Sequence, residues 1–164
     1  MKKLIAASLL LCATAVEAED VYIEGTVESR CMITTDTPGV YGNPTPYELS
    51  TDPVDGGVVP IVRYDVITGD YYKAVISHPD SFSSSPTLDD IVTWTGETSV
   101  EEVSDTAMSD YETNKVEYNN VTEFELTTAG TTWFKVDSAA EYGAQTSLPA
   151  GDYVAIIEAE CVAL

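Results

Sequence analysis

The sequence predicts an all-β fold, an antiparallel immunoglobulin-like β-sandwich of about seven strands with at most one short helix. Apolar residues alternate with polar ones near both ends of the chain. Between the ends, runs rich in β-branched and aromatic residues are separated by turn-forming residues. Alternation of period two indicates strands with one buried face, and short strands separated by regular turns are typical of sandwiches.

The first eighteen residues resemble a bacterial secretory signal peptide. Lys2 and Lys3 make the start basic, residues 4–15 form an apolar run too short to span a bilayer, and residues 16–18 offer a cleavage site. No later run is apolar and long enough to be a transmembrane segment. We therefore expect residues 19–164 to be exported as a single domain, to the periplasm, the cell surface or an extracellular filament.

The composition is strongly acidic. The chain has 28 Asp and Glu residues against 7 Lys and Arg residues, a formal net charge of -21. Such a charge repels phosphate backbones and anionic lipid headgroups, which argues against nucleic-acid binding. The protein is nevertheless expected to fold, because 44% of its residues are hydrophobic.

Two cysteines remain once the leader, with Cys12, is removed. Cys31 lies on the apolar face of an expected first strand, and Cys161 lies on the apolar face of an expected last strand. An even number of cysteines in an exported chain favours a Cys31–Cys161 disulfide. The alternative is a pair of buried thiols that never join.

The interior of the chain predicts further strands and one helix. Residues 58–67 and 71–77 are predicted to form a β-hairpin whose turn is Thr68-Gly69-Asp70. Other expected strands cover residues 91–95, 115–127 and 131–136, with a break at Asn119-Asn120 and a turn at Ala129-Gly130. Apolar residues at helical spacing, after a capping-box pattern, predict a helix over residues 100–111.

Residues suited to catalysis are scarce. His78 is the one histidine, and it precedes a proline, which is typical of a turn. The carboxylates at 89–90 and 101–102 are adjacent in the sequence rather than opposed across a cleft, as a catalytic pair would be. No calcium-loop motif is present. We therefore expect no enzymatic activity, no catalytic residue, no metal site and no cofactor beyond weak calcium binding.

Four aromatic residues allow two interpretations. Tyr71, Tyr72, Trp94 and Trp133 could stack on sugar rings, because aromatic faces suit the apolar faces of saccharides. They could equally pack in the core, and strand parity indicates that at least one tryptophan does so.

Both terminal segments resemble those of fimbrial, pilin-like subunits. The resemblance lies in residues 24–33, with the pattern Gly25-x-Val27-x-x-x-Cys31, and in residues 148–157, with Pro149-Ala150-Gly151-x-Tyr153 before the last strand. It implies a non-enzymatic structural or adhesive subunit of a cell-surface assembly, forming a homo-oligomer or filament with the help of a periplasmic chaperone.

In such assemblies, a strand from one subunit completes the sheet of its neighbour. Val21, Ile23 and Val27 have the alternation that such a strand needs, although they could also belong to the first strand of their own domain. The alternative function is a secreted carbohydrate-binding or adhesion module that acts as a monomer.

Overall fold

The computed structural model describes residues 23, 25–26, 30–144 and 146–164. The expected signal peptide therefore lies outside the described residues, and so do Val21 and Val27. Within the described part, no helix is long and apolar enough to cross a membrane.

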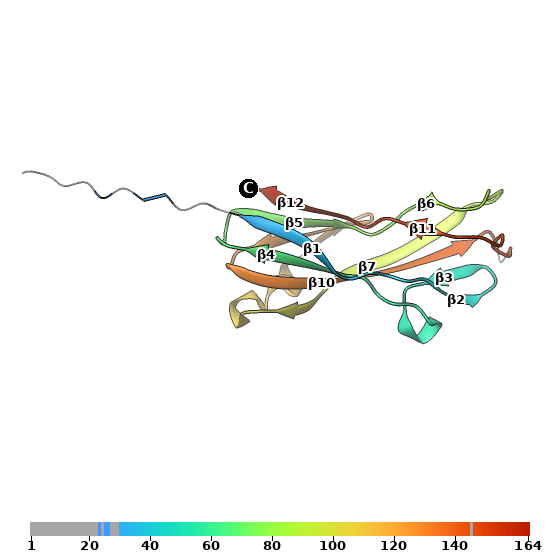
Figure 1. Ribbon diagram of the computed structural model, residues 1–164, viewed down its shortest axis with the longest axis horizontal. Helices are drawn as coiled ribbons and strands as arrows, with labels where there is room; N and C mark the ends of the chain where they lie inside the picture. Colours follow the sequence, from blue (N-terminus) through green and yellow to red (C-terminus); the bar gives the residue numbers. More distant parts are fainter. Residues whose placement is uncertain (1–22, 24, 27–29, 145) are drawn as a thin grey trace, which may run out of the picture.

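Two antiparallel sheets pack face to face in an elongated β-sandwich (Figure 1), which confirms the predicted fold class. The first sheet contains, in order, β1 (Cys31–Thr37), β4 (Ile61–Val66), β10 (Gly130–Tyr142) and β7 (Val92–Val103), with β3 (Glu48–Ser50) and β2 (Gly42–Thr45) beside the far half of β10. The second sheet contains β12 (Glu158–Ala163), β5 (Tyr72–Ser77), β9 (Val121–Leu126) and β8 (Val116–Tyr118). A short ladder of β11 (Val154–Ala155) and β6 (Phe82–Ser84) follows the β12–β5 pair toward the other end.

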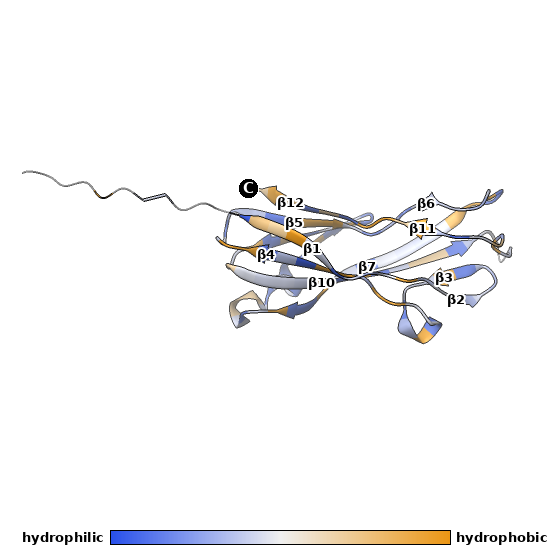
Figure 2. Ribbon diagram, in the orientation of Figure 1, coloured by the Kyte–Doolittle hydropathy of each residue, from blue (hydrophilic) through white to orange (hydrophobic). Residues whose placement is uncertain are grey.

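Alternation along the strands builds the core, as the sequence predicts. In β10, every second residue from Thr132 to Tyr142 is buried, and β4 and β9 follow the same period. Phe134 of one sheet packs on Phe124 of the other, with ring centroids 4.4 Å apart. Figure 2 accordingly shows apolar and polar residues interleaved along the strands.

The predicted hairpin between residues 58–67 and 71–77 is wrong. These stretches form β4 and β5, but β4 pairs with β1 and β10, whereas β5 pairs with β9 and β12. The turn at Thr68-Gly69-Asp70 carries the chain from one sheet to the other, where the amide of Asp70 donates to the carbonyl of Leu126. Periodicity identifies a buried face but does not identify the neighbouring strand, so the two connections look alike in the sequence.

The helix predicted over residues 100–111 is also wrong. Strand β7 continues to Val103, because β10 is long enough to pair with all of it, with a bulge at Glu101. Two short helical turns follow, the 3-10 helix η2 (Thr106–Met108) and α1 (Tyr111–Asn114). Another 3-10 turn, η1 (Pro53–Asp55), leads toward β4.

Two of the predicted turns are confirmed. Asn119, with a φ of 54°, separates β8 from β9. Gly130, with a φ of 148°, begins β10, and a Cβ there would collide with Met108 and Ser104. The predicted strand over 115–127 is therefore two strands, and the one over 131–136 extends to Tyr142.

Candidate functional site

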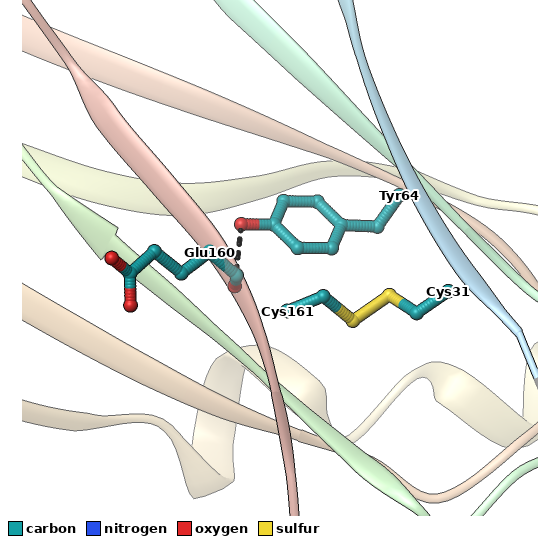
Figure 3. Close-up of a disulfide and its surroundings, with 4 residues drawn as sticks. All are labelled: Cys31, Tyr64, Glu160 and Cys161. Atoms are coloured by element: carbon teal, nitrogen blue, oxygen red, sulfur yellow. Dashed lines mark hydrogen bonds between the residues drawn. A yellow bond between two sulfur atoms is a disulfide. The ribbon is translucent and has the colours of Figure 1, made fainter.

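One long side of the sandwich is joined by the disulfide. Cys31 of β1 and Cys161 of β12 are bonded, with Cα atoms 6.3 Å apart across a sequence separation of 130 residues (Figure 3). Both strands are edges of their sheets, so the bond connects one edge to the other. The disulfide prediction is confirmed, and so is the inward orientation of the last strand, where Ala159 and Cys161 are partly buried between exposed glutamates.

A tyrosine supports the same side from within. The hydroxyl of Tyr64 donates to the carbonyl oxygen of Glu160 at 3.1 Å (Figure 3). Its ring is fully buried and meets Phe134 edge-on at 5.3 Å. Burial raises the pKa of Tyr64 above its usual range, and the nearby charge of Glu160 adds to the increase. The hydroxyl therefore stays protonated and keeps donating.

A groove opens between the segment that follows β1 and the segment that precedes β12. This groove, with a volume of about 420 Å³, lies between the segment at Val40-Tyr41 and the segment 153–157. Val40 is 54% exposed and Val154 is 49% exposed, so apolar side chains reach the solvent here. The Tyr41 hydroxyl is 2.9 Å from Ser138 Oγ in its wall. Burial raises the pKa of Tyr41, and the bond to Ser138 offsets part of that increase.

The expected strand-addition segment is described in part. Ile23 belongs to no strand and is 95% exposed. Gly25 and Thr26 are exposed as well, and the first strand begins at Cys31 rather than near residue 21. The structure therefore does not pack Ile23 into the sandwich of its own domain.

The four aromatic residues do not form one platform. Trp94 of β7 faces inward, because it pairs with buried Ala140, and its ring lies 4.7 Å from that of Phe82. Trp133 points to the outer face of the same sheet, because its neighbours Thr132 and Phe134 are the buried ones. Both tyrosines belong to the β5 end of the second sheet, where Tyr71 is 57% exposed and Tyr72 packs against the core.

The outer face around Trp133 is polar. Its indole N–H donates to Asp36 Oδ1 at 3.4 Å, and Arg63 and Glu102 are its partners in the adjacent strands. Arg63 is itself paired with Asp65 at 2.8 Å. Two residues along the strand, Lys135 borders a hollow of about 410 Å³. A half-buried indole on an outer sheet face, beside fixed polar groups, is the kind of surface on which a sugar ring can stack.

The opposite long side of the sandwich is held by a lysine that the sequence analysis missed. Lys115 Nζ lies 2.8 Å from Glu112, 3.0 Å from Glu117 and 3.2 Å from Glu97, and its side chain is 13% exposed. Burial alone lowers its pKa, but hydrogen bonds to the three carboxylates outweigh that effect and raise the pKa above its ordinary value. The local pattern Glu-x-x-Lys-x-Glu was the available signal.

Residues suited to chemistry do not converge. His78, half-buried, follows β5, and its Nδ1 lies 3.3 Å from the carbonyl oxygen of Pro79. Among the described residues, no group of three or more His, Cys, Asp or Glu side chains could hold a metal ion. Asn120, which lies in the turn between β8 and β9, donates to the carbonyl of His78 at 3.0 Å.

Comparison with known proteins identifies no relative. No family model, no curated protein and no solved structure matches the chain. The arrangement defines an antiparallel β-sandwich with a disulfide between two sheet edges.

Proposed function

We propose that this protein is an exported, non-enzymatic subunit of a cell-surface assembly, in which copies join by strand addition. The observation that carries the proposal is Ile23, an apolar residue 95% exposed in a segment of alternating apolar residues. An apolar side chain that is exposed within an alternating sequence is suited to pairing with the sheet of another molecule. A disulfide supports export, because such bonds persist in oxidising compartments.

The groove at Val40-Tyr41 and residues 153–157 is the matching acceptor. It lies between the segment that follows β1 and the segment that precedes β12, and Val40 and Val154 present apolar surface in it. An added strand there would cover these side chains with every second residue of its own, as a pleated strand requires. The same chain thus supplies both a donor segment and an acceptor groove, which is the arrangement that forms open, head-to-tail polymers.

The donor side is tested by replacing Val21 and Ile23 with Asp. We expect the polymers seen by sedimentation and negative-stain microscopy to disappear while a folded monomer remains, because the inserted face becomes charged. The matched control places the same two charges on the opposite parity, Tyr22→Asp with Thr26→Asp, and should polymerise. Unfolding of the Val21→Asp/Ile23→Asp monomer would assign these residues to their own core and refute the proposal.

The acceptor side allows a complementation test. Val40→Asp should also stop polymerisation by placing a charge in the groove. When the Val40→Asp protein is mixed with the Val21→Asp/Ile23→Asp protein, one partner retains the segment and the other retains the groove, so discrete heterodimers should form. A mixture that stays monomeric would contradict the pairing of this segment with this groove.

A second candidate function rests on the surface around Trp133. Its indole is half-buried on the outer face of the first sheet, beside Arg63 and Asp36. Because the basic groups here are already paired with carboxylates and the protein is acidic, an uncharged saccharide is the ligand we favour. This function is adhesion by a monomer.

Retention of the monomer on neutral polysaccharide resins tests this candidate. Trp133→Ala should bind the resin at least tenfold more weakly. A tenfold loss corresponds to about 1.4 kcal/mol, which an aromatic stacking contact can contribute. Tyr71→Ala is the matched control, because Tyr71 is an exposed aromatic residue of the other sheet. Equal retention of both variants, or none of the wild type, would exclude a saccharide site at Trp133.

A further inference from the structure

Strand β7 has one free edge. It runs for twelve residues and pairs with β10 along one side only, and no strand of the described chain pairs with its other side. Exposed edges of this length are a hazard, because their unpaired N–H and C=O groups attract other strands. The residues Val92 to Gly96 at one end of it carry no charge.

A neighbouring segment covers part of this edge. We call residues 104–115 the guard segment. Glu112 Oε2 accepts from the amide of Val100 at 2.7 Å, and Lys115 Nζ donates to the carbonyl of Thr98 at 3.0 Å. In an antiparallel ladder, the backbone groups of alternate residues point to the same side, so these two bonds occupy consecutive pairing positions of the free edge.

The core holds the guard segment in place. Met108 and Tyr111 are 1% and 3% exposed, and the Tyr111 hydroxyl accepts from the amide of Thr128 at 3.0 Å. The ion pairs of Lys115 with Glu97, Glu112 and Glu117 complete the cover. The backbone N–H and C=O of Gly96, next along the edge, make no hydrogen bond with described residues outside the β7–β10 ladder.

We propose that the free edge of β7 is a self-complementary pairing surface, that its occupant is β7 of a second copy, and that the guard segment keeps it closed. In a two-fold antiparallel register centred on Thr98, Gly96 opposes Val100 and Glu97 opposes Ser99. No carboxylate then faces a carboxylate, which matters in a chain of net charge -21. Two of the groups that this register needs, Thr98 C=O in the central pair and Val100 N–H in the next hydrogen-bonded pair, are those taken by Lys115 and Glu112.

The test removes the two side chains that cover the edge and then uses an intermolecular disulfide to detect the proposed register. The Ile23→Asp substitution is included throughout, so that strand addition through the N-terminal segment cannot contribute. Into this background we introduce Glu112→Ala and Lys115→Met, and then either Glu97→Cys or Ser99→Cys. Residues 97 and 99 would be a non-hydrogen-bonded pair, whose Cα spacing of about 4.5 Å permits a disulfide.

We call the protein with Ile23→Asp, Glu112→Ala and Lys115→Met the opened protein. We expect it to sediment as a dimer at micromolar concentrations. The Glu97→Cys and Ser99→Cys variants should form a disulfide-linked dimer at least tenfold faster when mixed than either does alone. The control pair Lys73→Met with Glu123→Ala, which removes a cross-strand ion pair and leaves the guard segment intact, should remain monomeric. A folded, opened protein that stays monomeric and gives no mixed disulfide would overturn the proposal.

A second measurement covers the case in which the opened protein does not fold. In the protein without guard substitutions, the Val100 amide should exchange slowly with solvent although no strand pairs with it, and Glu112→Ala alone should raise its exchange rate at least tenfold. Fast exchange of this amide before any guard substitution would show that the edge is not closed, and would refute the proposal independently of any polymerisation.

Discussion

The side of the sandwich with edge strands β1 and β12 is closed by a covalent bond, whereas the side with edge strands β7 and β8 is closed by an ammonium group among three carboxylates. The disulfide acts mainly on the unfolded chain, whose ends it ties together, and it is insensitive to pH and salt. The lysine acts on the folded state and depends on its charge. One side thus depends on the oxidised state of Cys31 and Cys161, and the other depends on the protonated state of Lys115. Each can be weakened without changing the other.

The largest expected effect is loss of the disulfide. Replacing both Cys31 and Cys161 with Ser should lower the free energy of unfolding by about 5 kcal/mol, the chain-entropy value for so long a loop. Equilibrium denaturation in urea measures it, with the reduced wild-type protein as a control. A loss below about 1 kcal/mol would show that the unfolded chain is already compact.

An intermediate effect is expected from Lys115→Met. Removing the ammonium leaves three carboxylates and the Thr98 carbonyl without their donor, and should cost about 2 kcal/mol. Lys73→Met, which removes a single ion pair that is more exposed to solvent, should cost clearly less than Lys115→Met. Equal losses for the two variants would mean that burial of Lys115 does not strengthen its contacts.

The pH dependence sharpens the comparison. Because the folded-state pKa of Lys115 is raised, its contribution is fully present below the unfolded-state pKa, roughly 10.4, and is lost as the pH rises through the higher folded-state value. The stability difference between the wild type and Lys115→Met should therefore be constant from neutral pH to about pH 10 and shrink above it. The difference between wild type and the cysteine-free variant should show no such alkaline decline.

The smallest expected effect is that of Tyr64→Phe. It removes the hydrogen bond to the Glu160 carbonyl but keeps the ring, and should cost about 1 kcal/mol. Thermal unfolding with the disulfide intact and reduced distinguishes two roles. If the hydrogen bond and the disulfide hold β12 independently, the two losses will add; a smaller combined loss would show that they act on the same opening of the edge.

Much of the fold could be predicted from the sequence, because it depends on local pattern. The alternation in residues 153–163 and the parity of Cys161 were sufficient to orient the last strand. The failed helix shows the limit of this reasoning, since Val100 and Val103 have helical spacing but lie in β7, where pairing with β10 overrides the local pattern.

The candidate surfaces were less predictable. The exposed position of Ile23 contradicts the view that the first strand starts near residue 21, and nothing in its neighbours would have shown this. Trp94 and Trp133 look equivalent as strand residues, yet they lie on opposite faces of one sheet. The Glu-x-x-Lys-x-Glu pattern around Lys115 did not predict its buried ion pairs, because carboxylates lie near most residues of so acidic a chain.

By itself, the sequence determined the fold class, the buried faces of most strands and the joining of Cys31 to Cys161, because side-chain periodicity and cysteine number are properties that a chain carries locally. The tertiary structure decided which strands are neighbours, which segments line the groove, and that Glu112 and Lys115 reach the edge of β7. These depend on contacts between distant segments, whose register is set by the packing of the whole sandwich.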